Sequence, residues 1–576
     1  MKFVKQKIKK LNFYLIIIFI LGGFLRFYGL NWDQGSHIHP DERFLTMIGN
    51  AMRIPNTVAD YFNPHTSTFN PTNIGFGFFV YGIFPLTLNK ILAVFFSNDS
   101  YNSFTLQGRF LSALFDVLIV LLVYKTIELF ERKYNLNSSV KYWTSFFYAI
   151  AVLPIQLSHF FAVDTFLNFF MFASFYFVLR FSFKGHLWNI VLSSIFFGLA
   201  ISSKISAIFI LPLIIFFLFY RMFKKENEKF VSIAFIKQFL NKETLMGKIP
   251  KTTLLLCIYL AVAYITIRLA DPYLFEKGSF LEPTISGNFW ESVKSLKSFE
   301  GKDVWYPPAI QWINKPPIVF SLLNLVFFGV GLPYFVSIVA GFYFIFKKIR
   351  KIDLIVIFLW VFGFFLFQST QFVKAMRYFI FLYPFLAIFA GVGFYYSTYK
   401  LKNVFRIGIL MIVLLWSIMF ISIYSQKHSR VVASEWMYQN LKDKSVILVE
   451  YWDDALPVST LNTYGKTFMI EQLTVFDPDT SDKWQKMNYL LANADYLVLS
   501  SNKGWGSIPT VPEKYPLMSK FYQDLFDGRT SYKKTKEFTS YPSLRYLGIP
   551  IDFPDDWADE VFTVYDHPKV MIFKKI

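Results

Sequence analysis

Two adjacent carboxylates are the first candidates for chemistry in this sequence. Asp41 and Glu42 follow His39 and Pro40 in a short polar segment. A third carboxylate, Asp164, stands in an otherwise apolar stretch. A carboxylate in an apolar setting can accept the proton of an incoming nucleophile. All three are therefore candidates for catalysis, and the sequence does not rank Asp41 against its neighbour Glu42.

Four basic residues could complement these acids. Each stands at the end of an apolar stretch or in a short turn between two stretches: Arg109, Lys204, Arg268 and Arg377. Arginine can bind a phosphate through two parallel hydrogen bonds, and lysine binds it as a point charge. Acids and bases at one membrane depth would suit transfer of a group from a phosphate-linked lipid, because the cations stabilise the departing phosphate.

Each of these residues also has a purely structural interpretation. Pro40 followed by two acids is typical of the first turn of a helix, and Asp164 is equally consistent with a helix cap. The four basic residues could simply extend to the membrane interface. His37 and His39 beside the two acids have the residue types of a divalent metal site. Four ligands within one short loop form a weak pattern, so a metal is kept only as an alternative.

The elements that must position these residues are membrane helices. Of 576 residues, 54% are hydrophobic and only 17% are charged, which excludes an ordinary soluble protein. The net charge of +19 does not indicate nucleic-acid binding, because the basic residues form short clusters between apolar stretches. The single cysteine, Cys257, excludes an internal disulfide. Roughly 17 to 25 apolar residues cross a bilayer. The runs that we expect to cross are 11–30, 107–130, 141–161, 165–183, 187–203, 204–220, 253–270, 318–346, 353–371, 377–399 and 404–424.

One further run, 76–96, decides the topology. It is long enough to cross, but it contains Pro85, Asn89 and Lys90. If it lies along the membrane surface, every basic cluster falls on the side of the N-terminus, as the positive-inside rule requires. These clusters include the one between 221 and 251. We therefore expect a multi-pass plasma-membrane protein with a cytoplasmic N-terminus and the candidate acids and bases at the outer face.

Two domains are expected. Residues 1–424 form the membrane domain, with an outer loop at 31–106, and residues 425–576 form a small α/β domain outside the cell. Within the second domain, the patterns predict a helix at 431–441 and strands at 445–451 and 496–500. They also predict a pair of strands over 561–573 about a turn at 566–568.

The acidic loop carries a family resemblance. Trp32-Asp33-Gln34-Gly35 and His39-Pro40-Asp41-Glu42, just after the first apolar run, resemble the first-loop motif of the GT-C glycosyltransferases, in particular the dolichyl-phosphate-mannose-protein mannosyltransferase-like family 39. Weaker similarities follow in the same order over about residues 10–400: Arg109-Phe-Leu-Ser-Ala-Leu, Asp164 with Phe169-Phe170, Ser203-Lys204 with Leu211-Pro212, and Arg377-Tyr378 with Tyr383-Pro384. Thr165-Phe166 departs from the family's pattern after the acid.

The resemblance implies a fold and a reaction. It implies a polytopic helical GT-C protein that transfers a sugar from a polyprenyl-phosphate donor to an acceptor hydroxyl, with inversion at the anomeric carbon. By this carry-over Asp41 is the general base, with Glu42 as its rival, and Asp164 orients the acceptor or the base. Arg377 and Lys204 bind the donor phosphate, and Arg109 and Arg268 are further candidates for that role. The acceptor is a glycan, a glycolipid or a protein.

Two other classes of protein remain as alternatives. The first is a multi-span transporter or flippase, which usually has two matching halves and site residues near the midplane. Here the charges gather at one face and the halves do not match. The second is a polysaccharide polymerase or ligase, which also uses a lipid-linked substrate. The sequence identifies neither the sugar nor the acceptor, and it implies no certain cofactor.

Overall fold

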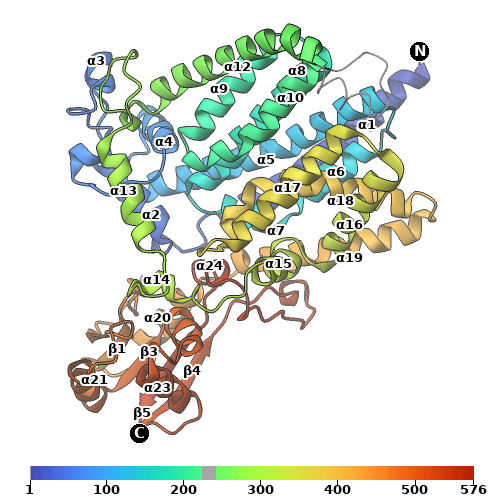
Figure 1. Ribbon diagram of the computed structural model, residues 1–576. Coiled ribbons are helices and arrows are strands. Elements are labelled where there is room, and N and C mark those ends of the chain that lie inside the picture. The colour runs from blue at the N-terminus through green and yellow to red at the C-terminus, as the bar shows by residue number, and fades with distance from the viewer. Residues whose placement is uncertain (1, 224–241, 461) are drawn as a thin grey trace.

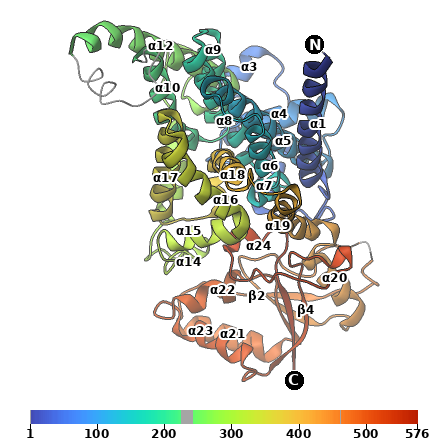
Figure 2. The same cartoon turned by 90° about the vertical axis from the view of Figure 1, so that its right-hand side faces the viewer.

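A computed structural model describes residues 2–223, 242–460 and 462–576. A bundle of helices makes up most of it, and a smaller domain built on a sheet lies at one end of the bundle (Figure 1). The view turned by 90° shows the same division, with the short helices α14 (Pro307–Ile310), α15 (Val319–Asn324) and α24 (Glu560–Thr563) near the junction (Figure 2). Part of the basic cluster expected between 221 and 251 lies outside the described residues.

Eight helical stretches in the described part of the chain are long and apolar enough to cross a membrane, and each overlaps an expected run. Run 318–346 is divided, because 319–329 forms separate short helices and the span itself begins at Leu332. The chain is thus a multi-span membrane protein. The helices concerned are α5 (Tyr101–Tyr134), α8 (Val163–Lys184), η2 (Ile205–Ile210) with α10 (Leu211–Phe223), α12 (Lys242–Ala270), α16 (Leu332–Phe344) with η5 (Ile345–Ile349), α17 (Ile352–Thr370), η6 (Met376–Leu382) with α18 (Tyr383–Thr398), and α19 (Asn403–Ile421).

The remaining three expected runs are also helical, but their continuous apolar helices are shorter than the eight above; in the first of them the apolar part covers Phe13–Phe27. They correspond to α1 (Lys2–Phe27), α6 (Val140–Ala149) with α7 (Val152–Ser158), and α9 (Trp188–Ile201). Run 141–161 is interrupted at Ile150 because Pro154 has no N–H to donate to the carbonyl four residues earlier. That carbonyl instead accepts a hydrogen bond from the hydroxyl of Ser417.

A buried arginine satisfies the other carbonyls at this break. Arg26 of α1 donates from Nη1 to the carbonyl of Ala149 (2.8 Å) and from Nη2 to that of Tyr148 (3.2 Å). Its Nε donates to the carboxylate of Asp116 in α5, and both side chains are fully buried. Asp116 also accepts a hydrogen bond from the hydroxyl of Tyr148 (2.6 Å). A charged pair is tolerated at this depth because each member is hydrogen-bonded by protein.

Run 76–96 forms a much shorter helix than its length predicts. Only α4 (Phe84–Phe95) is helical, and 12 residues are too few to cross a bilayer. The segment before it is irregular and is held against the turn that precedes Lys204. The N–H groups of Gly82 and Phe84 donate to the carbonyls of Ser203 and Ser202, both at 3.0 Å. A side chain at Gly82 has no room, since a Cβ there would lie 2.0 Å from the Ser202 oxygen.

The second domain contains a five-stranded mixed sheet of order β2-β1-β3-β5-β4. Strands β1 and β2 and strands β1 and β3 are parallel, whereas β5 is antiparallel to both β3 and β4. One face packs against α20 (Ser429–Asn440), and the other packs against α21 (Ser481–Asn493) and α23 (Pro516–Phe526). The strands are β1 (Val446–Glu450), β2 (Met469–Leu473), β3 (Tyr496–Leu499), β4 (Tyr532–Phe538) and β5 (Val570–Lys575).

One expectation for this domain is wrong. Segment 561–573 is not a pair of strands, because its first part is the helix α24 and only its last part is the strand β5. Asp559 caps α24 by accepting a hydrogen bond from the N–H of Val561 (3.3 Å). The helix packs on the membrane domain, where Phe562 contacts Phe328 and Phe420. Strand β5 pairs instead with β4, which lies earlier in the chain.

Candidate active site

Two ion pairs bring together four of the predicted residues. Asp41 of α2 (Pro40–Ala51) pairs with Arg377 of η6, and Asp164 of α8 pairs with Lys204 at 2.8 Å. The two pairs are neighbours, because Arg377 lines the same cavity as Asp164 and Lys204. Carboxylates from distant parts of the chain thus meet cations at one place, as the sequence predicts.

Asp41 owes its position to the start of α2. His39 precedes the helix, and its Nδ1 accepts a hydrogen bond from the N–H of Glu42 (3.3 Å). Pro40 occupies the first helical position, where its missing N–H is not needed. Burial would raise the pKa of Asp41, but the charge of Arg377, aided by His39 and Lys204, lowers the pKa to about 2. The side chain remains 23% exposed, so a substrate can reach it.

A cavity of about 280 Å³ opens beside the two pairs. Its charged lining consists of Asp164, Lys204, Lys297, Glu300 and Arg377. The lining also includes aromatic side chains that come from membrane helices: Phe209, Phe364, Phe367, Tyr378 and Phe381. The cavity therefore suits a ligand with an anionic head and an apolar tail.

The phenylalanines of this lining extend to the outside of the bundle. Phe209 packs against Phe364 and Phe367 with ring centroids 5.2 and 5.5 Å away. Phe364 is buried, but Phe367 is 46% exposed on the surface of α17. A chain of apolar groups thus leads from the charged end of the cavity to a helix surface that faces lipid.

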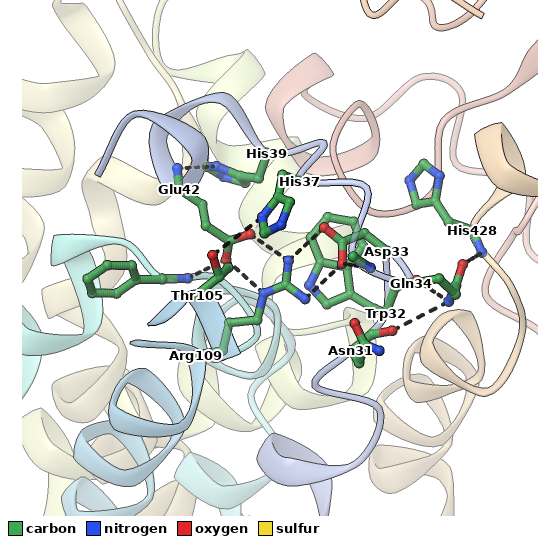
Figure 3. Close-up of polar contacts among 12 residues, drawn as sticks. Asn31, Trp32, Asp33, Gln34, His37, His39, Glu42, Thr105, Arg109 and His428 are labelled. Carbon is green, nitrogen blue, oxygen red and sulfur yellow. Dashed lines mark hydrogen bonds and ion pairs between the residues drawn. The ribbon is translucent and has the colours of Figure 1, made fainter. Parts of the chain in front are cut away.

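Glu42 and Arg109 belong to a separate, fully buried cluster (Figure 3). Arg109 donates from Nη1 and Nη2 to the two oxygens of Asp33 (3.1 and 2.8 Å) and from Nε to Glu42 (2.8 Å). Nη2 also donates to Glu42, and Nη1 donates to the carbonyl of Leu30 (2.7 Å). Glu42 accepts a further bond from the N–H of Phe161 (2.8 Å).

This cluster changes two of the expected roles. All five N–H groups of the Arg109 guanidinium have protein acceptors, so the residue has no donor left for a phosphate. Glu42 is enclosed by its partners and is not exposed at all. Both residues hold the start of α2 against α5, and Asp41 is the partly exposed member of the two adjacent acids.

Arg268 is also committed to the fold rather than to the cavity. Its Nη1 donates to the carbonyl of Lys277 (2.7 Å), Nη2 donates to that of Glu282, and Nε donates to the Tyr264 hydroxyl (2.9 Å). The guanidinium stacks on Phe275 at 3.8 Å. These contacts secure the loop after α12, and they leave no basis for the expected phosphate-binding role.

The histidines do not fit a metal site. His37 bonds through Nε2 to the side chain of Asn102, while His39 caps α2 between the rings of Phe160 (4.4 Å) and Tyr565 (4.2 Å). Among the residues that the structure describes, no group of three or more His, Cys, Asp or Glu side chains is arranged to hold a metal ion. No metal is therefore assigned a role at this site.

Several residues of the site had escaped the sequence analysis. Lys297 and Glu300 come from α13 (Gly287–Ser298) and the residues just after it, where they resemble any solvated charges of an amphipathic helix. Tyr81 lies within electrostatic range of Asp41 and Asp164, and burial together with the charge of Asp41 raises its pKa. The ion pair of Asp33 could have been predicted from the sequence, because a lone acid directly after a membrane span needs a buried partner.

Comparisons with known proteins agree with this architecture. Residues 78–266 match the family model for dolichyl-phosphate-mannose-protein mannosyltransferase. None of the curated proteins matches the sequence. Among solved structures, the chain is similar to the Archaeoglobus fulgidus oligosaccharyltransferase tethered with an acceptor peptide, with 14% identity, a TM-score of 0.52, and coverage of 98% of this chain and 88% of that one. It is also similar to ArnT from Cupriavidus metallidurans bound to undecaprenyl phosphate, with 11% identity, a TM-score of 0.44, and coverage of 96% and 97%.

At these identities the likeness to solved structures is one of fold, and the family match covers the part of the chain that carries Asp164 and Lys204. The fold class expected from the first-loop motif is confirmed. The chain thus shares its fold with a solved oligosaccharyltransferase, and its residues 78–266 are similar to the dolichyl-phosphate-mannose-protein mannosyltransferase family.

Proposed function

We propose that this protein transfers a sugar from a polyprenyl-phosphate donor to an acceptor hydroxyl at the outer face of the plasma membrane. One observation carries the proposal: the Asp41–Arg377 and Asp164–Lys204 pairs meet at a cavity whose lining also contains aromatic side chains of membrane helices. A phosphate linked to a long apolar chain fits this cavity, because the phosphate can bind the cations and the apolar chain can pack on the aromatic side chains.

The donor phosphate would bind between Arg377, Lys204 and Lys297. Arg377 offers a planar guanidinium whose Nε has no hydrogen-bond partner among the described residues. Asp164 would hold Lys204 in place through its 2.8 Å contact. The prenyl chain would leave the cavity past Phe209 and Phe367 towards lipid.

The Asp41–Arg377 pair is the resting state in this mechanism. With Arg377 beside it, Asp41 has a pKa of about 2 and is a weak base. When the donor phosphate binds Arg377, it partly neutralises the positive charge that lowers the pKa of Asp41. The pKa of Asp41 then rises, because burial favours the protonated carboxyl group. Binding of the donor thus prepares the base for the acceptor.

The reaction is a single displacement. The acceptor oxygen attacks the anomeric carbon and its proton passes to Asp41. The bond between that carbon and the phosphate oxygen breaks as the new glycosidic bond forms, and polyprenyl phosphate leaves with the bonding electrons. Attack opposite to the leaving group inverts the anomeric centre, as expected from the family resemblance. Arg377 and the two lysines stabilise the charge that develops on the phosphate.

The acceptor would approach Asp41 from the side of the sheet domain. Tyr306 lies within electrostatic range of Asp41 and stacks on Phe299 at 4.4 Å. On its other side it meets Trp452, which is 45% exposed, at 5.7 Å. Such aromatic faces suit a sugar ring or a peptide. They leave the glycan, glycolipid and protein acceptors open.

The orientation in the membrane is part of the proposal. We place the N-terminus in the cytoplasm and residues 425–576 outside, because the basic loops then all face the cytoplasm. The sheet domain lies at the end of the bundle near α2 and α13 (Figure 1), so this orientation exposes the active site to the outer side.

The test is release of polyprenyl phosphate by the purified protein in lipid nanodiscs. We expect a set of polyprenyl-phosphate sugars to include one that yields polyprenyl phosphate and a glycosylated acceptor, and Asp41→Asn to abolish both products. Asp60→Asn is the matched control, since Asp60 is a partly buried carboxylate of the same outer loop that takes part in the capping box of α3 (Val58–Phe62). Movement of an intact lipid-linked sugar across the bilayer without any release would support the transporter alternative instead.

A further inference from the structure

Segment 559–565 contacts residues close in sequence to both partners of the Asp41–Arg377 pair: Asp559 bonds to the backbone of Met376, and Tyr565 packs on His39. We propose that segment 559–565 completes the active site, with Asp559 and Tyr565 acting as positioning residues for Arg377 and Asp41. The inference rests on the proposed function for its catalytic meaning, but the contacts themselves involve only residues of this chain. Nothing in the sequence around Asp559 indicates such a role.

Asp559 fixes the backbone next to Arg377. Its Oδ2 accepts a hydrogen bond from the N–H of Met376 at 2.8 Å, and its own N–H donates to Asn324 Oδ1 at 2.7 Å. The residue is 1% exposed, so water does not compete for these bonds. Met376 begins η6, and Arg377 is the next residue. A shift of this peptide would displace the guanidinium from Asp41 and from the donor phosphate.

Tyr565 acts on the other partner. Its ring lies 4.2 Å from the ring of His39, whose other neighbour is Phe160 at 4.4 Å. His39 caps α2 and so sets where Pro40 and Asp41 begin the helix. The tyrosine ring therefore holds the cap in the orientation that its Nδ1 needs.

A buried polar cluster anchors the segment close to these contacts. His567 lies between Asp555, at 2.9 Å, and Asp566, and burial is outweighed by these two carboxylates so that the pKa of His567 rises to about 10. Asp566 also accepts hydrogen bonds from Gln156 (3.0 Å) and Tyr424 (2.8 Å) of the membrane domain. The two positioning residues thus sit on a segment that is tied down just beyond them.

A second contact from the sheet domain supports the same conclusion. Arg43, two residues after Asp41, pairs with Asp454 at 3.1 Å, and Asp454 is shared with the buried Arg430 at 2.8 Å. The first turn of α2 is therefore also held by the loop that follows β1. The sheet domain and the segment 559–565 therefore contact residues close to both Asp41 and Arg377, as expected if they help to position this pair.

The first measurement is hydrogen exchange in the full-length protein. In Asp559→Ala, the peptide that contains Met376 should exchange faster than in the wild type, whereas Asp559→Asn should stay close to wild type because the amide oxygen can still accept the bond. The control Asp552→Ala removes an acid from the same part of the chain that pairs with the exposed Arg545. It should leave exchange at Met376 unchanged.

The second measurement is steady-state transfer by the same variants. We expect kcat to fall about 10- to 100-fold in Asp559→Ala and in Tyr565→Ala, because a displacement of about 1 Å has an effect of this size. Asp559→Asn and Tyr565→Phe should keep kcat within about threefold of wild type, given that each preserves the contact. In an Arg377→Ala background, Asp559→Ala should have little further effect, since there is no guanidinium left to position.

Four outcomes would overturn the inference: unchanged exchange and kcat in Asp559→Ala, an equal loss in Asp552→Ala, no rescue by Asp559→Asn, or full additivity with Arg377→Ala. The proposed function can fail separately. If the wild type shows no transfer while Asp559→Ala still loosens the Met376 peptide, the positioning contact stands and the assigned reaction is wrong.

Discussion

Asp41 and Glu42 are consecutive residues, yet their carboxylates contact different arginines: Asp41 pairs with Arg377 of η6, and Glu42 pairs with Arg109 of α5. One pair is partly exposed beside the cavity, and the other is fully buried. The two adjacent acids thus differ in what they can do. Asp41 can contact a substrate, whereas Glu42 holds the loop in place.

Substitution should separate these two roles. Asp41→Asn should lower turnover by about 10²- to 10⁴-fold, the usual contribution of a general base, without changing the thermal midpoint of unfolding. Glu42→Gln should instead destabilise the fold by about 3–5 kcal/mol, because it removes one charge from a buried ion pair. Turnover and thermal unfolding in detergent, measured on both variants, check this. A stable but inactive Glu42→Gln protein beside an active Asp41→Asn protein would reverse the assignment.

Arg377 and Lys204 should determine affinity for the lipid phosphate. Replacing either by alanine should weaken binding of polyprenyl phosphate about 10- to 100-fold, since a hydrogen bond to a charged group contributes about 1.5–3 kcal/mol. Equilibrium binding in nanodiscs measures the effect. Lys277→Ala is the control, because Lys277 is 63% exposed and pairs with the partly exposed Glu282. Wild-type affinity in both alanine variants would mean that the phosphate binds elsewhere.

The acid limb of the pH–rate profile should depend on Arg377. Asp41 must be ionised to accept a proton, so activity is lost as pH falls through its pKa, which is about 2 in the resting pair. Without Arg377, burial raises that pKa with less opposition, and the acid limb of Arg377→Ala should move to higher pH. Rates from pH 4 to 8 test the direction. A profile of unchanged shape at lower amplitude would show that the two residues are not coupled.

Glu450 should make the sheet domain less stable as pH rises. Burial raises the pKa of Glu450 to about 8, so between about pH 4.5 and pH 8 the folded state holds a proton that the unfolded state releases. The free energy of unfolding then decreases with pH by up to about 1.4 kcal/mol per pH unit. Glu450→Gln should remove this slope, whereas Glu435→Gln, at a more exposed ion pair, should retain it. Equal slopes in wild type and Glu450→Gln, measured by chemical unfolding, would contradict the prediction.

Cysteine labelling checks the orientation in the membrane. In a Cys257→Ser background, a membrane-impermeant thiol reagent should reach Asn98→Cys, in the exposed turn after α4, from outside the cell only. Ser139→Cys, an exposed position in the loop between α5 and α6, should react only after the membrane is opened. The reverse labelling pattern would show that the membrane topology is inverted and that the active site faces the cytoplasm.

The helices of the bundle could be predicted because lipid admits little else. An apolar run in a membrane must satisfy its own backbone, so length and composition indicate a helix. Two strands of the sheet domain had no comparable signal. In β2 and β4 most residues are exposed, and β4 consists largely of charged residues, so neither shows the alternation that marks a half-buried strand.

The sequence predicts which residues lie at the candidate site, but it does not predict which of them contact each other. Topology brings acids and bases to one face, which is why Asp164 and Lys204 are expected at the same membrane level as Asp41. Which arginine faces which acid depends on packing between distant helices, and so the hydrogen bonds that Arg109 and Arg268 make within the fold could not be predicted. Asp116 was detectable, since an acid in the middle of a span requires a partner.

The ion pair between Arg26 and Asp116 has a consequence for assembly. The first helix supplies the only described charge that neutralises Asp116, and it also occupies two carbonyls of α6. Until α1 and α5 dock, these polar groups would face hydrocarbon during biogenesis. Helix α1 is thus part of the packed bundle and does more than anchor the chain in the membrane. A variant in which α1 is deleted or replaced would enter the bilayer with Asp116 lacking its ion-pair partner.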